Sequence, residues 1–235
     1  MNTLKAIIFD MDGTLVDSLM LWDVIWETIS QKYCNGVSFL PKPEDEKAVR
    51  TLPLKTGMTL LQERYNLAPS AQALYETVNN VFVDFYANKV TLKPGVREFL
   101  QECKKRDIKM CVASASATDL IEIALSHCGV RDCFAQIFSC ATSGKGKEFP
   151  DIFLVARDAL GEPMEETWVA EDSIVALKTA SDIGMPTMGV YDRYNPDQES
   201  IKQIATVYIG PDETMEKLFL ANKGVNDITC RNLKP

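Results

Sequence analysis

A short apolar run that ends in an acidic turn constrains this chain more than any other feature of its sequence. Residues 6–9 read Ala-Ile-Ile-Phe, a pattern typical of a strand that is buried on both faces of a parallel sheet. Asp10 and Asp12 follow at its carboxyl end, and Gly13 allows a sharp turn. Because ligands of open α/β sheets bind at this end of the strands, we expect Asp10 and Asp12 to face a ligand.

Two carboxylates at the mouth of a buried strand repel each other and resist desolvation. A hard cation with oxygen ligands removes both costs, and Mg²⁺ suits such a site. One carboxylate can also attack phosphorus and form an aspartyl-phosphate. A solvated Asp-Gly turn is the alternative that this motif leaves open by itself, since short motifs also arise without a function.

Residues 9–18, Phe-Asp-Met-Asp-Gly-Thr-Leu-Val-Asp-Ser, resemble the first motif of the haloacid dehalogenase (HAD) superfamily. The similarity is greatest to the subgroup with a helical cap, which includes β-phosphoglucomutase-like and phosphoglycolate phosphatase-like proteins. It covers roughly residues 1–20 and 90–210, is weaker between them, and is absent near the carboxyl terminus. The resemblance implies a Rossmann-like α/β core with an inserted all-helical cap.

The pattern of the whole chain agrees with this fold class. Apolar runs that predict strands alternate with helical periodicity, which is typical of a doubly wound, mostly parallel α/β sheet. After the first strand, we expect strands at 109–113, 135–139, 167–170, 187–190 and 206–209, and helices at 96–106, 118–128, 151–160, 173–183 and near 213–222. The tail, 223–235, is polar and has no predicted packing role.

The residues between the first and second strands predict only helices. Helical spacing covers 15–34, 57–65 and 70–86, with Ser70 as an N-cap, and Gly and Pro residues make 35–56 less regular. We therefore expect 16–88 to form a helical cap domain, and 1–15 with 89–235 to form the HAD-like α/β core.

Composition excludes several partners. A net charge of −8 and a pI near 4.8 argue against nucleic acid and anionic membranes, and no apolar run approaches a membrane span.

The start lacks a long apolar leader, and seven Cys without CxxC spacing predict reduced thiols. We expect a cytoplasmic monomer. The single His127 lies in a helical pattern, so acid–base chemistry falls to carboxylates.

Ser114 follows the predicted strand 109–113. Its hydroxyl, with the amides of Ala115 and Ser116, can hold a phosphate oxygen at the start of a helix. The resemblance gives the matching Ser or Thr this role. A helix N-cap is the alternative function for Ser114, and Ser116 is a second candidate for that cap.

Residues 144–153 read Gly-Lys-Gly-Lys-Glu-Phe-Pro-Asp-Ile-Phe. A fixed ammonium here would offset the charge of carboxylates and phosphate. The family pattern is a Lys, two residues and then Pro-Asp, which selects Lys147 as the catalytic lysine. Lys145 stays a rival because Gly146 makes the loop adaptable, and a solvated loop charge is the ordinary role of a lone Lys.

Glu171 and Asp172 follow the predicted strand at 167–170. The resemblance implies that they complete a Mg²⁺ shell with Asp10 and the backbone carbonyl of Asp12, and that Asp172 does so more consistently than Glu171. The alternative is that Asp172 caps the next helix. The family often has Gly where this chain has Ala176, which concerns packing and not the metal.

The resemblance also implies a reaction, in which Asp10 is the nucleophile and Asp12 the general acid/base. Haloacid dehalogenases lack a carboxylate at the position of Asp12, so its presence favours phosphate esters. We expect a Mg²⁺-dependent phosphatase that hydrolyses a small phosphomonoester, such as a sugar phosphate, through an aspartyl-phosphate.

Two alternatives remain. β-Phosphoglucomutase-like sequences have a His in the first cap helix and a later Gly-x-Ser-Arg segment. This chain has Trp22 and residues 52–57, Leu-Pro-Leu-Lys-Thr-Gly, at those places, which favours hydrolysis over a phosphosugar mutase. Lys55 is a candidate substrate contact, although a solvated charge suits it equally. The other alternative is a catalytically silent HAD-fold binding protein.

Overall fold

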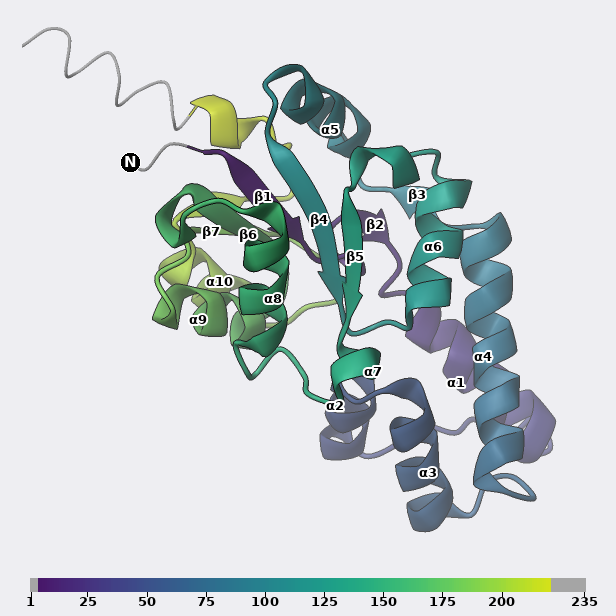
Figure 1. Cartoon of the computed structure of the whole chain (residues 1–235). Coiled ribbons are helices and arrows are strands. Elements are labelled where there is room, and N and C mark those ends of the chain that lie inside the picture. Colours follow the sequence, from purple (N-terminus) through teal and green to yellow (C-terminus); the bar gives the residue numbers. More distant parts are fainter. Residues whose placement is uncertain (1–3, 221–235) are drawn as a thin grey trace, which may run out of the picture.

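The computed structural model describes residues 4–220, and its centre is a parallel sheet in the order β5-β4-β1-β6-β7-β8 (Figure 1). The strands are β1 (Ala6–Phe9), β4 (Lys109–Ser114), β5 (Gln136–Ser139), β6 (Thr167–Glu171), β7 (Thr187–Val190) and β8 (Val207–Ile209). Each matches an expected apolar run. The predicted doubly wound α/β fold is therefore confirmed, with β1 paired to β4 on one side and β6 on the other.

Helices cover both faces of the sheet. Successive side chains of β1 point to opposite faces, so its apolar residues pack against helices on both sides. Ile7 and Phe9 pack in one hydrophobic cluster with α5 (Val96–Lys105) and α6 (Thr118–His127). Ala6 and Ile8 pack in a second cluster with α8 (Asp151–Leu160) and α9 (Ile174–Asp182). The remaining short elements are α7 (Cys140–Ser143), α10 (Gln198–Ile204) and the 3-10 helices η1 (Arg131–Cys133) and η2 (Met164–Glu166).

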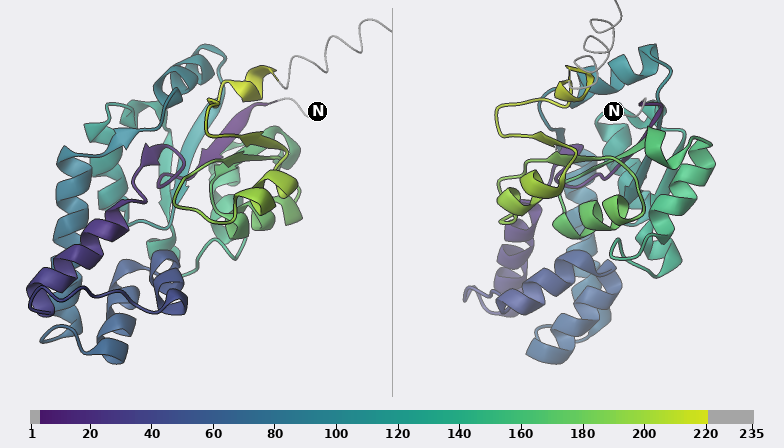
Figure 2. Two further views of the ribbon diagram at one scale, coloured as in Figure 1. Left: turned by 180° about the vertical axis from the view of Figure 1, so that it is seen from behind. Right: turned by 90° about the vertical axis from the view of Figure 1, so that its left-hand side faces the viewer.

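A group of helices lies between β1 and β4 in the sequence and to one side of the sheet in space (Figure 2). It comprises α1 (Leu21–Tyr33), α2 (Pro43–Thr51), α3 (Leu54–Tyr65) and α4 (Ala71–Asn88). These helices share a hydrophobic cluster of their own. Two short antiparallel strands, β2 (Val16–Asp17) and β3 (Thr91–Leu92), pair where the chain leaves and re-enters the sheet domain.

The structure differs from the sequence-based expectation in this insertion. The helix expected from residue 15 begins at Leu21, because residues 16–17 pair with 91–92 instead. A regular helix, α2, forms where irregular structure was expected. Pro43 occupies its first position, where the missing N–H costs nothing, and acidic residues fill its first turn.

Two expectations about local features of the chain, the helix cap at Ser70 and the reduced thiols, agree with the structure. Ser70 is the N-cap of α4, and its hydroxyl accepts a hydrogen bond of 3.1 Å from the amide of Ala73. The cysteines at 34, 103, 111, 128, 133 and 140 are free thiols. Among residues 4–220, no helix is both long and apolar enough to cross a membrane. The final expected helix is seen only over 217–220, and the tail 223–235 lies outside the described residues.

Candidate active site

Asp10 follows β1 directly, and its backbone continues the ladder: the Asp10 amide donates to the carbonyl of Ala170 at 2.9 Å. The chain then turns tightly, because the amides of Leu15 and Val16 both donate to the carbonyl of Met11. Gly13 in this turn has φ +78°, a conformation that side chains with a Cβ rarely adopt. The turn leaves the Asp10 carboxylate buried at the end of the sheet.

Three carboxylates meet there, as the sequence predicted. Asp10, Glu171 and Asp172 each offer an oxygen within 4.8 Å of the other two, and all three side chains are buried. The gathering follows from the pairing of β1 with β6, whose carboxyl ends lie side by side. Thr14 donates its hydroxyl to Asp172 Oδ1 at 3.3 Å.

Lys147 supplies a cation to this cluster from the loop before α8. Its Nζ lies 2.5 Å from Asp10 Oδ1 and also contacts Glu171 Oε1. The rival Lys145 instead forms an exposed ion pair with Asp151, at 2.5 Å. The structure therefore brings Lys147, and not Lys145, beside the candidate nucleophile.

Burial dominates the electrostatics of the cluster. It raises the pKa of Asp10 well above its usual value, against the opposing charge of Lys147. Burial, followed by the charge of Glu171, raises the pKa of Asp172 to about 7. Burial alone would lower the pKa of Lys147, but the charges of Asp10 and Glu171 raise it, so the ammonium stays charged.

The cluster fits a divalent cation. Three buried carboxylates beside one buried ammonium leave an excess of negative charge. Burial first, and the neighbouring carboxylates after it, raise the pKa values of Asp10 and Asp172, so the deprotonated cluster is costly unless a cation offsets its charge. An all-oxygen, carboxylate-rich donor set is the kind that Mg²⁺ binds.

Asp12 lies beside this cluster and accepts hydrogen bonds from three hydroxyls. Ser18 Oγ and Tyr86 Oη both donate to Oδ1 at 2.6 Å, and Ser116 Oγ donates to Oδ2 at 2.8 Å. The sequence did not predict any of these contacts. Ser116 was considered as a helix cap, but the N-cap position of α6 belongs to Ala117 and the Ser116 side chain faces Asp12.

An internal hydrogen bond occupies part of the predicted phosphate-binding turn. Ser114 is buried at the end of β4, and its hydroxyl accepts a hydrogen bond of 3.1 Å from the Ser116 amide. Of the two amides expected to face phosphate, that of Ser116 is thus engaged within the turn, and Ala115 is exposed. Lys55 is exposed in the first turn of α3, and no hydrogen bond or ion pair joins its ammonium to the other predicted residues.

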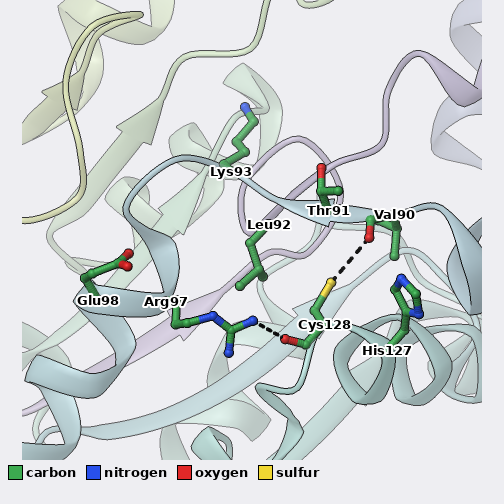
Figure 3. A pocket seen from close by; sticks show the side chains of 8 residues that line it. All are labelled: Val90, Thr91, Leu92, Lys93, Arg97, Glu98, His127 and Cys128. Carbon is green, nitrogen blue, oxygen red and sulfur yellow. Dashed lines mark hydrogen bonds between the residues drawn. The ribbon is translucent and has the colours of Figure 1, made fainter.

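A separate hollow of about 330 Å³ lies between β3, α5 and the end of α6 (Figure 3). Its lining includes His127 and Cys128, and Arg97 donates to the Cys128 carbonyl at 2.6 Å. None of the carboxylates described above lines it. His127, which is exposed at the end of α6, therefore lies apart from the acidic cluster.

Comparison with known proteins identifies the family. The model of the haloacid dehalogenase-like hydrolases matches residues 4–184. The chain belongs to this family. The resemblance of the first motif to the HAD superfamily is thereby confirmed.

Two curated relatives of this HAD-like hydrolase are phosphatases. It is 30% identical over 194 residues to the probable pseudouridine-5'-phosphatase of Drosophila melanogaster, covering 79% of this chain and 80% of that protein. It is 24% identical over 217 residues to the phosphorylated carbohydrates phosphatase of Thermotoga maritima, covering 92% and 98%. Among solved structures, a putative β-phosphoglucomutase from Thermotoga maritima has a TM-score of 0.74 at 23% identity, covering 94% and 99%.

Proposed function

We propose that this HAD-like hydrolase is a Mg²⁺-dependent phosphatase that hydrolyses a small phosphomonoester, such as a sugar phosphate, through an aspartyl-phosphate on Asp10. It is a phosphoric monoester hydrolase. One observation carries the proposal: the Lys147 ammonium contacts Asp10 and Glu171 in a buried site that also holds Asp172. The names of the two curated relatives support phosphatase chemistry.

The reaction has two steps. Asp10 attacks phosphorus, and the bond to the leaving oxygen breaks as Asp12 donates a proton to that oxygen. Asp12 then takes a proton from a water molecule whose oxygen attacks the phosphorus of the aspartyl-phosphate. Inorganic phosphate leaves and the Asp10 carboxylate is restored.

The charge of the transferred phosphoryl group is offset by Lys147 and by the hydroxyl of Ser114, with the amide of Ala115 beside it. Asp10, Glu171 and Asp172, with the backbone carbonyl of Asp12, would hold Mg²⁺, which supplies a further positive charge at the phosphoryl oxygens.

We also propose that residues 16–88 act as a cap over a core made of 1–15 and 89–235. Figure 1 shows the arrowheads of β4 and β5 directed toward α2 and α3, so the insertion lies at the end of the sheet where a substrate would sit. The cap would exclude water and select the leaving group, with Lys55 as its candidate contact. The net charge of −8 argues against nucleic acid and anionic membranes as partners. We propose a small phosphorylated metabolite as the partner, and we expect the protein to act as a cytoplasmic monomer.

The test is phosphate release from p-nitrophenyl phosphate and a panel of sugar phosphates, with Mg²⁺ and with EDTA. Wild type should release phosphate only with Mg²⁺. Asp10→Asn should lower kcat by at least about 10³-fold and Lys147→Ala by about 10²-fold. Lys145→Ala is the matched control and should stay within about twofold of wild type.

Three outcomes would contradict the proposal. Absence of release by wild type from every ester would favour a silent binding protein. Full activity in Asp10→Asn would show that Asp10 is not the nucleophile. Isomerised sugar phosphate without free phosphate would indicate a mutase. Trapping wild type, but not Asp10→Asn, with beryllium fluoride would provide independent support for attack by Asp10.

A further inference from the structure

The Asp12 carboxylate is held by hydroxyls from three separate parts of the chain. Ser18 lies in the segment between β2 and α1, Ser116 in the loop after β4, and Tyr86 in the last turn of α4. The two serines belong to connecting segments. Tyr86 is the one of these donors that a helix carries, and its side chain is only 1% exposed.

The ring of Tyr86 is fixed by other aromatic rings. Phe82, one turn earlier in α4, stacks on it with a centroid distance of 5.9 Å, and Phe85 packs edge-on at 5.7 Å. Phe82 in turn packs edge-on against Trp22 of α1 at 5.8 Å. A ring held in this way cannot rotate its hydroxyl away from Asp12 unless α4 itself shifts, because interiors of proteins are closely packed.

The helix that carries Tyr86 contributes to two of the three hydrophobic clusters described above. Leu74 and Val78 of α4 pack among the inserted helices, whereas Tyr86 packs in the cluster that contains β1, α5 and α6. The bond from Tyr86 to Asp12 therefore joins the inserted helices to the acidic turn.

We propose that Tyr86 is a positioning residue whose hydroxyl fixes the orientation of the Asp12 carboxyl toward the leaving oxygen. The inference rests on the proposed function, since Asp12 has a proton to transfer only if the chain cleaves phosphomonoesters. A general acid must lie within hydrogen-bond distance of the oxygen it protonates. Without the Tyr86 hydroxyl, the serines of two connecting segments are the side-chain donors left to Asp12 among residues 4–220, and we expect its carboxyl to populate other rotamers.

The reaction offers a selective readout, because leaving groups differ in their need for a proton. p-Nitrophenolate leaves without help, whereas phenolate, with a conjugate acid near the tyrosine pKa of about 10, benefits from protonation. Tyr86→Phe keeps the ring and removes the hydroxyl. It should lower kcat/KM at least about tenfold for phenyl phosphate and less than about threefold for p-nitrophenyl phosphate. Damage to the fold would lower both values equally.

Tyr65→Phe is the matched control. The Tyr65 hydroxyl donates to the buried Asp45 Oδ2 at 2.6 Å, the same kind of bond at the same length, among the inserted helices. Its removal should leave the ratio of the two kcat/KM values unchanged. In an Asp12→Ala background, Tyr86→Phe should cause no further selective loss, because the group that it positions is gone.

Each other result counts against the inference. Equal loss with both esters assigns Tyr86 a structural role, and an unchanged or higher rate with phenyl phosphate shows that the hydroxyl does not direct the proton. Either result leaves the proposed phosphatase function standing. Failure of wild type to hydrolyse both esters with Mg²⁺ would overturn that function and this inference together.

Discussion

Residue 13 must be glycine for two independent reasons. Its φ of +78° lies in the region that side chains with a Cβ rarely adopt, and an added Cβ would lie 2.6 Å from Asp172 Oδ2. The closeness of this position to Asp172 means that the turn can pack against the acidic cluster only without a side chain at residue 13. The absence of a side chain at Gly13 thus makes room for a candidate metal ligand.

We predict that Gly13→Ala lowers kcat/KM by at least about tenfold, because Asp172 must move and small displacements in an active site are costly. The free energy of unfolding should fall by about 1–2 kcal/mol from backbone strain. Gly184→Ala is the control, since Gly184 has φ +89° and no atom within 4 Å of an added Cβ. It should lose similar stability but no activity, as measured by urea unfolding and phosphate release. Equal activity losses in the two variants would contradict the argument.

The sequence predicted the residues of the acidic cluster because each follows an apolar run that had to be a strand. Parallel strands bring such residues to one edge, so Asp10 and Asp172 could be placed together without a structure. Tyr86 could not be predicted. It lies 74 residues from Asp12, and in an apolar helical pattern its ring looks like any core aromatic. A hydrogen bond between residues so far apart leaves no pattern in the local sequence from which it could be predicted.

At the scale of elements, the strands were predictable and the short connections were not. The strand at residues 6–9 is apolar throughout and buried on both faces, a pattern that is typical of a central strand of a parallel sheet. β2 and β3 are two residues each and pair across the whole insertion, so neither has a period to detect. In α2, Pro43 was interpreted as an interruption although proline is favoured at a first helical position.

The packing of individual elements predicts which thiols react. Burial raises the pKa of Cys103 on α5 and of Cys111 on β4 to about 12, whereas Cys34 and Cys133 are partly exposed. At about pH 8, N-ethylmaleimide should label Cys34 and Cys133 at least about 100-fold faster, since the thiolate is the reactive form. Peptide mass spectrometry gives the rates. In guanidinium chloride the difference should vanish, and equal rates in the native protein would show that the core elements open readily.

At the scale of the whole molecule, the acidic cluster links pH, Mg²⁺ and stability. The pKa of Asp172 is about 7 in the folded protein and near 3.8 when unfolded, so between these values the native state holds a proton that the unfolded state has lost. Stability therefore falls as pH rises through this window. Asp10, whose pKa burial also raises, acts in the same direction.

We predict that the metal-free protein is less stable at about pH 8 than at about pH 5 by up to a few kcal/mol, because each unit of pKa shift corresponds to about 1.4 kcal/mol. Mg²⁺ binds the native, deprotonated cluster, so its stabilisation should be larger at the higher pH and amount to about 3 kcal/mol at 100 times its Kd. Urea unfolding at both pH values, with Mg²⁺ and with EDTA, measures these terms. Asp172→Asn should weaken both the pH dependence and the response to Mg²⁺. Equal stabilisation by Mg²⁺ in wild type and in this variant would place the ion elsewhere on the molecule.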